Sequence, residues 1–91
     1  MTQTLDELRA VIDAADAELV AVLARRFQAV EGVAAIKARD GLPVVDPARI
    51  EIVQDRVAGL AAEAGLDPGI ARRLWRAIID EAVAMENEKI G

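Results

Sequence analysis

Apolar residues recur at alternating spacings of three and four along the first 40 positions of the chain. The positions in this stripe are Leu5, Leu8, Ile12, Ala15, Leu19, Val22, Ala29, Val33 and Ile36. Such spacing places side chains on one face of an α-helix. Thr4 stands where a helix N-cap belongs, and Gly41 stands where a helix ends. The pattern therefore predicts one helix over residues 5–39, roughly 50 Å long at about 1.5 Å per residue.

Two further helices are predicted by repeated start signals. Asp46-Pro47 and Asp67-Pro68 each place a capping carboxylate before a proline, the residue preferred in the first helical turn. Helical spacing of apolar residues then continues from Ile50 until Gly65, and again from Ile70 to Ala82. Strand-type alternation is almost absent. We therefore expect an all-α chain of three unequal helices that forms a single domain over residues 1–91.

The first predicted helix is longer than a compact chain of 91 residues is wide. The two shorter helices cannot easily cover its whole apolar stripe. A homodimer in which two long helices pack together buries the remainder, and this is the assembly that we expect. A monomeric three-helix hairpin with a frayed end is the alternative.

Composition excludes several kinds of chemistry. The chain has no cysteine and no histidine, so disulfide frameworks, zinc sites, thiol catalysis and Ser-His-Asp catalysis are ruled out, and we expect neither a metal nor a cofactor. The net charge of −5 disfavours a nucleic-acid partner. No apolar run is long enough for a membrane helix, and the polar N-terminus does not resemble a signal peptide. We therefore expect a cytoplasmic protein with no membrane partner.

Four charged residues break the apolar patterns. Arg26 falls on the stripe of the first helix, and Lys37 follows three turns later on nearly the same face. Arg49 stands in the first turn of the second helix, where a cation opposes the helix dipole. Glu86 continues the stripe of the third helix. A buried cation is costly unless it meets an anion, so these positions indicate a site for an anionic small molecule. Solvation or pairing with a nearby charge is the simpler alternative at each of them.

Arg9 lies 17 residues before Arg26 on the same predicted helix. This separation is about 25 Å along a rigid rod, too far for both side chains to hold one small ligand. In an antiparallel dimer, however, Arg9 can reach the site of the partner chain.

An ordered set of motifs resembles the all-α chorismate mutases over essentially the whole chain. The motifs are Leu8-Arg9, Ile12-Asp13, Asp16, Leu23–Phe27, Lys37, Gly41–Val44, Asp46–Arg49, Gly65–Asp67, Trp75 and Ile78-Ile79. The resemblance implies an intertwined homodimer with shared active sites. It also implies the pericyclic rearrangement of chorismate to prephenate, in aromatic amino acid biosynthesis, without a cofactor. The substrate of that reaction is a small dicarboxylate, and its ether bond breaks during the rearrangement.

The resemblance also implies residue roles. Arg26 corresponds to an arginine that binds a substrate carboxylate, and Arg9 to an arginine contributed by the partner chain. Lys37 corresponds to the lysine that contacts the ether oxygen and a carboxylate. Arg49 and Asp46 correspond to residues near the substrate, Asp46 beside its ring hydroxyl. Cationic side chains suit this reaction, because it needs a held conformer and a stabilised charge on the ether oxygen.

Three positions depart from the family pattern. Ile50 replaces a glutamate that contacts the ring hydroxyl, Glu86 replaces a glutamine that donates to the ether oxygen, and Ala82 replaces a small polar residue. An ionised carboxylate only accepts hydrogen bonds, so Glu86 helps catalysis only when protonated, unless Lys37 alone serves the ether oxygen. An apolar residue at position 50 also occurs in isochorismate-pyruvate lyases and 4-amino-4-deoxychorismate mutases. These activities, and a non-catalytic helical dimerisation module, remain as alternatives.

Overall fold

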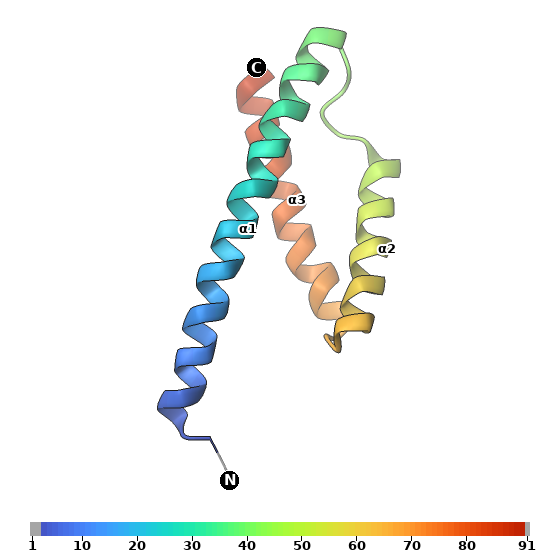
Figure 1. Ribbon diagram of the computed structural model, residues 1–91. Coiled ribbons are helices and arrows are strands. Elements are labelled where there is room, and N and C mark those ends of the chain that lie inside the picture. Colours follow the sequence, from blue (N-terminus) through green and yellow to red (C-terminus); the bar gives the residue numbers. More distant parts are fainter. Residues whose placement is uncertain (1–2, 91) are drawn as a thin grey trace.

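Three helices make up the computed structural model, which describes residues 3–90 (Figure 1). Helix α1 spans Leu5–Asp40, α2 spans Pro47–Ala64 and α3 spans Pro68–Ile90. Thr4 caps α1 by accepting a hydrogen bond from the Glu7 amide at 3.1 Å. Glycines with positive φ end α1 and α2, Gly41 at 66° and Gly65 at 81°. The all-α class and the three predicted helices are confirmed. The ends of α1 and α2 agree with the prediction to within a residue, whereas α3 continues beyond Glu86, the last predicted position of its stripe.

Helix α3 packs against both other helices, whereas α1 and α2 stand apart. Among the described residues, no Cα atom of α1 comes within 8 Å of a Cα atom of α2. The N-terminal half of α1 projects beyond the rest of the chain (Figure 1). The molecule is accordingly long and thin, with principal extents of 59 × 23 × 15 Å. None of the described helices combines the length and apolar character needed to cross a membrane.

The small core lies between α2 and α3. Val53, Val57 and Ile79 form it, with Trp75 and Val83 packed against them. Polar contacts on the outside also join the two helices. The Arg72 guanidinium lies 2.9 Å from Asp55, and Gln54 donates to the Arg72 carbonyl at 3.1 Å. The α2–α3 pair is therefore the best-packed part of the chain.

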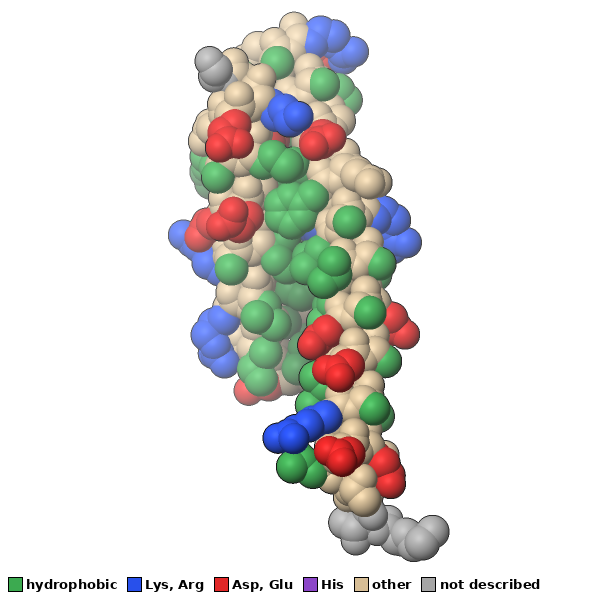
Figure 2. Space-filling model, turned by 90° about the vertical axis from the view of Figure 1, so that its left-hand side faces the viewer, with side chains coloured by type: hydrophobic (Ala, Val, Ile, Leu, Met, Phe, Trp, Pro, Cys, Tyr) green, Lys and Arg blue, Asp and Glu red, His purple; other side chains and the backbone are tan. Residues whose placement is uncertain are grey.

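Helix α1 carries two apolar stripes. Helix α3 covers one of them, but it is not the stripe that the alternating three-four spacing predicts. Ala34 is buried, while Leu23, Phe27 and Val30 are half-buried. The predicted stripe lies about 100° around the helix and stays open. Its large residues remain 43–62% exposed, namely Leu5, Leu8, Ile12, Leu19, Val22, Val33 and Ile36. Hydrophobic side chains also gather in the hollow beside the projecting arm (Figure 2). A single chain therefore leaves its most regular apolar face exposed to water.

Candidate active site

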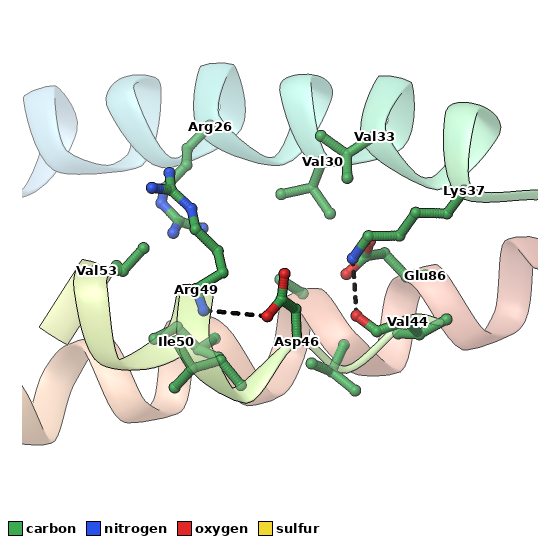
Figure 3. A pocket seen from close by; sticks show the side chains of 13 residues that line it. Arg26, Val30, Val33, Lys37, Val44, Asp46, Arg49, Ile50, Val53 and Glu86 are labelled. Atoms are coloured by element: carbon green, nitrogen blue, oxygen red, sulfur yellow. Dashed lines mark hydrogen bonds and ion pairs between the residues drawn. The ribbon is translucent and has the colours of Figure 1, made fainter. Parts of the chain in front are cut away.

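A cavity of about 190 Å³ opens between α1 and α2, with α3 as its floor (Figure 3). This is more than ten times the space that one water molecule needs, so the cavity can hold a small organic molecule. Its apolar lining comes from Val30, Val33, Val44, Ile50, Val53, Ile79, Ala82 and Val83, and its charged lining from Arg26, Lys37, Asp46, Arg49 and Glu86. The site exists because α1 and α2 do not close on each other.

The cationic end of the cavity holds two arginines from different helices. Arg26 comes from the middle of α1 and Arg49 from the first turn of α2 (Figure 3). Neither guanidinium has a carboxylate within 4.0 Å among the described residues. Burial lowers the pKa of Arg26, and the nearby charges of Arg56 and Arg49 lower it further. This end of the cavity is therefore suited to an anion.

Lys37 stands at the opposite end, held from two sides. Its ammonium donates to the Val44 carbonyl at 2.7 Å and lies 2.9 Å from Glu86 Oε1 (Figure 3). An ammonium has three N–H donors, so beside these two contacts at least one remains for a ligand in the cavity. The Val44 contact was not predicted from the sequence, because a main-chain acceptor leaves no mark on residue type.

Glu86 is buried on α3, as the predicted stripe required. Its Oε1 atom is shielded from water and makes no well-aligned hydrogen bond, so its contact with Lys37 is a charge pair. Glu86 therefore holds the ammonium of Lys37 at the cavity wall.

Asp46 has two roles. Its Oδ1 atom accepts from the Arg49 amide at 3.2 Å and caps α2. The same side chain lines the cavity, beside Ile50. The cap therefore fixes a carboxylate at the cavity wall.

Seven of the eight predicted site residues meet at this cavity, namely Arg26, Lys37, Asp46, Arg49, Ile50, Ala82 and Glu86. Arg9 does not: it is exposed on the projecting half of α1, away from the cavity of its own chain. The apolar lining residues Val30, Val33, Val44, Val53, Ile79 and Val83 were not predicted as site residues. Helical spacing was the available signal for all of them except Val44, which lies in a loop, but this spacing does not distinguish a cavity wall from a packed core.

Comparison with known proteins agrees with the site. The family described as Chorismate mutase type II matches residues 8–87. A 4-amino-4-deoxychorismate mutase of Streptomyces venezuelae is 37% identical over 91% of this chain and 81% of its own length. A protein of the same name in Streptomyces pristinaespiralis is 37% identical over 98% of this chain and 69% of its own length. A chorismate mutase of Methanocaldococcus jannaschii is 30% identical over 97% of this chain and 89% of its own length. With its three helices and its cationic cavity, the chain belongs to the type II chorismate mutase family.

Proposed function

We propose that this protein is a chorismate mutase that converts chorismate to prephenate. The observation that carries the proposal is the distribution of charge in the cavity. Two arginines that have no counter-ion among the described residues stand at one end, and an ammonium with a donor left for a ligand stands at the other. This arrangement suits a dicarboxylate whose ether bond breaks during the reaction.

In the proposed reaction the protein forms no covalent bond with the substrate. Arg26 and Arg49 bind the carboxylates and hold the compact conformer against the apolar wall of α2 and α3, which lowers the entropic part of the barrier. The remaining donor of Lys37 stabilises the negative charge that grows on the ether oxygen. Because Val44 and Glu86 already hold the ammonium, it needs little reorganisation as that charge develops.

A second candidate substrate is 4-amino-4-deoxychorismate. The cavity offers a ring substituent the carboxylate of Asp46 and the apolar side chain of Ile50. A carboxylate binds a charged amine more strongly than a neutral hydroxyl, because both partners are then ionised. The two Streptomyces relatives at 37% identity carry the name of that activity.

One assay distinguishes these candidates. The purified protein is offered chorismate, isochorismate and 4-amino-4-deoxychorismate in parallel, and the products are separated by chromatography. We expect prephenate from chorismate. Conversion of the amino substrate alone would replace the first candidate by the second, and salicylate with pyruvate from isochorismate would identify a lyase. No product from any of the three would contradict an enzymatic function and favour a helical dimerisation module.

We also propose that the protein is a homodimer. A compact monomer of 9.7 kDa exposes about 5,100 Å² of surface. This chain exposes 6813 Å² and has a radius of gyration of 16.5 Å, against about 12 Å for a compact chain of its length. The excess area, about 1,700 Å² per chain, corresponds to a total interface in the range of obligate dimers. In the proposed dimer the two chains meet along the exposed apolar stripe of α1.

The same dimer accounts for Arg9. An antiparallel partner that packs along the stripe carries its own Arg9 toward the cationic end of this cavity. We propose that each site contains Arg26, Lys37 and Arg49 of one chain together with Arg9 of the partner subunit. The projecting half of α1 then completes the partner's active site.

A further inference from the structure

An arginine outside the cavity lining extends the cationic end of the site. Arg56 lies on α2 two turns after Arg49, and that spacing places both side chains on one face of the helix. Val53 lies between them on the same face, where it is buried and lines the cavity. The face of α2 that forms the cavity wall therefore continues directly to Arg56.

The guanidinium of Arg56 has no ion pair and no side-chain hydrogen bond within residues 3–90. Its neighbour Asp55 faces away and pairs with Arg72. The positive charge of Arg56 acts instead on Arg26, where it opposes ionisation more strongly than Arg49 does. Three arginines thus gather in a chain whose net charge is −5, although carboxylates are plentiful.

The formal charges in and around the cavity indicate which kind of ligand the three arginines attract. The cavity lining itself holds three cations, Arg26, Lys37 and Arg49, against the carboxylates of Asp46 and Glu86, which leaves a formal charge of +1. A substrate with two carboxylates carries −2. Arg56 raises the local formal charge to +2, and Arg9 of the partner subunit, in the proposed dimer, raises it to +3. The surroundings of the cavity therefore attract a dianion, although the chain as a whole is negative.

We propose that Arg56 is a further substrate-binding residue, an exposed cation beside Arg26 that attracts and helps to hold a substrate carboxylate. The identity of the dianion rests on the proposed function. Because Arg56 is exposed, its effect falls mainly on substrate capture and is screened by salt, whose Debye length is about 10 Å at 0.1 M. The rearrangement itself, which takes place beside Lys37, is not affected.

Three variants test the proposal: Arg56→Gln, Arg56→Lys and Arg73→Gln. The last is the matched control, since Arg73 is an exposed arginine on α3 outside the cavity lining. We expect Arg56→Gln to raise KM about 3- to 10-fold at low ionic strength, with kcat little changed, and to weaken the salt dependence of kcat/KM. Arg56→Lys keeps the charge and restores most of the loss. Arg73→Gln changes KM by less than about twofold.

Equal KM values for Arg56→Gln and Arg73→Gln would overturn the proposal. So would dissociation of the dimer in Arg56→Gln, detected by sedimentation, because Arg56 would then pair with a carboxylate of the partner. A wild-type protein that converts neither chorismate nor its amino analogue would instead contradict the proposed function. In that case, calorimetric titration of the variants with prephenate still tests Arg56, and an unchanged affinity in Arg56→Gln would overturn its role.

Discussion

At the scale of single residues, Arg26 is a charge in an unfavourable position. It is half-buried, it has no counter-ion among the described residues, and its pKa is lowered by burial and by two neighbouring arginines. Removing it leaves a substrate carboxylate unpaired in the cavity. We expect Arg26→Ala to reduce kcat/KM by about 10²-fold or more, in a steady-state assay.

The fold of Arg26→Ala should survive, because the substitution removes a repelled and partly desolvated charge from the free protein. Its urea midpoint should equal or exceed that of the wild type. Arg25→Ala is the control, since Arg25 is the exposed neighbour outside the cavity lining. If both variants lost activity equally, the loss would reflect damage to the helix and not to the site.

Glu86 is the residue at which charge and hydrogen bonding make different demands. It pairs with Lys37 at 2.9 Å, yet only its protonated form can donate to an ether oxygen. Glutamine can accept from Lys37 and donate at the same time. We expect Glu86→Gln to hold or raise kcat near neutral pH, because glutamine adds a donor and keeps an acceptor for Lys37, as a steady-state assay would reveal.

The exposed Glu88 supplies the control for this experiment. Glu88→Gln removes the same charge from the same helix, outside the cavity lining, and should leave kcat unchanged. A clear fall of kcat in Glu86→Gln, but not in Glu88→Gln, would contradict the prediction. It would show that the reaction needs the negative charge that holds Lys37.

Three charged residues of the site could be predicted from the sequence because each of them breaks a local rule. Arg26 and Glu86 interrupt apolar stripes, and Arg49 opposes a helix dipole. The pairing of Lys37 with Glu86 could not be predicted in the same way, since it depends on how α1 crosses α3. The contact with Val44 depends on the path of the loop. Helical periodicity carries no information about such contacts between elements.

At the scale of elements, helix ends were predicted more accurately than helix faces. The caps at Thr4, Gly41 and Asp46 are local signals, and the structure places them as expected. The choice of the buried face of α1 is not local. The more regular stripe remains open, and α3 covers a second stripe that includes Val30 and Ala34. Periodicity detects an apolar face, but it does not identify the chain that covers it.

Asp46 both caps α2 and lines the cavity, and two substitutions separate these roles. Asn caps helices about as well as Asp, whereas Ala lacks the acceptor and costs about 1 kcal/mol of stability. We therefore expect Asp46→Ala to lower the urea midpoint and Asp46→Asn to keep it. Both variants lose the carboxylate, so both should discriminate against 4-amino-4-deoxychorismate relative to chorismate. An unchanged kcat/KM ratio for the two substrates in Asp46→Asn would show that the carboxylate does not read the ring substituent.

At the scale of the whole molecule, the proposed dimer accounts for both the exposed stripe of α1 and the distant Arg9. Arg9 and Arg26 lie on opposite halves of α1, so no single protomer brings them to one cavity. An antiparallel dimer would bring together Arg9 of one chain and Arg26 of the other. The dimer should sediment near 19 kDa, twice the 9.7 kDa of the chain. A stable monomer at micromolar concentration would contradict both the assembly and the shared site.

Mixing two inactive variants tests the shared site directly. Arg9→Ala and Arg26→Ala each disable both sites of their own homodimer. After unfolding and refolding together, every heterodimer should contain one intact site, so statistical pairing restores about a quarter of wild-type activity. Arg26→Ala mixed with Lys37→Ala is the control, because those residues belong to one chain's site and each heterodimer site then keeps one lesion. If mass spectrometry detects heterodimers while the first mixture stays as inactive as the control, Arg9 does not act across the interface.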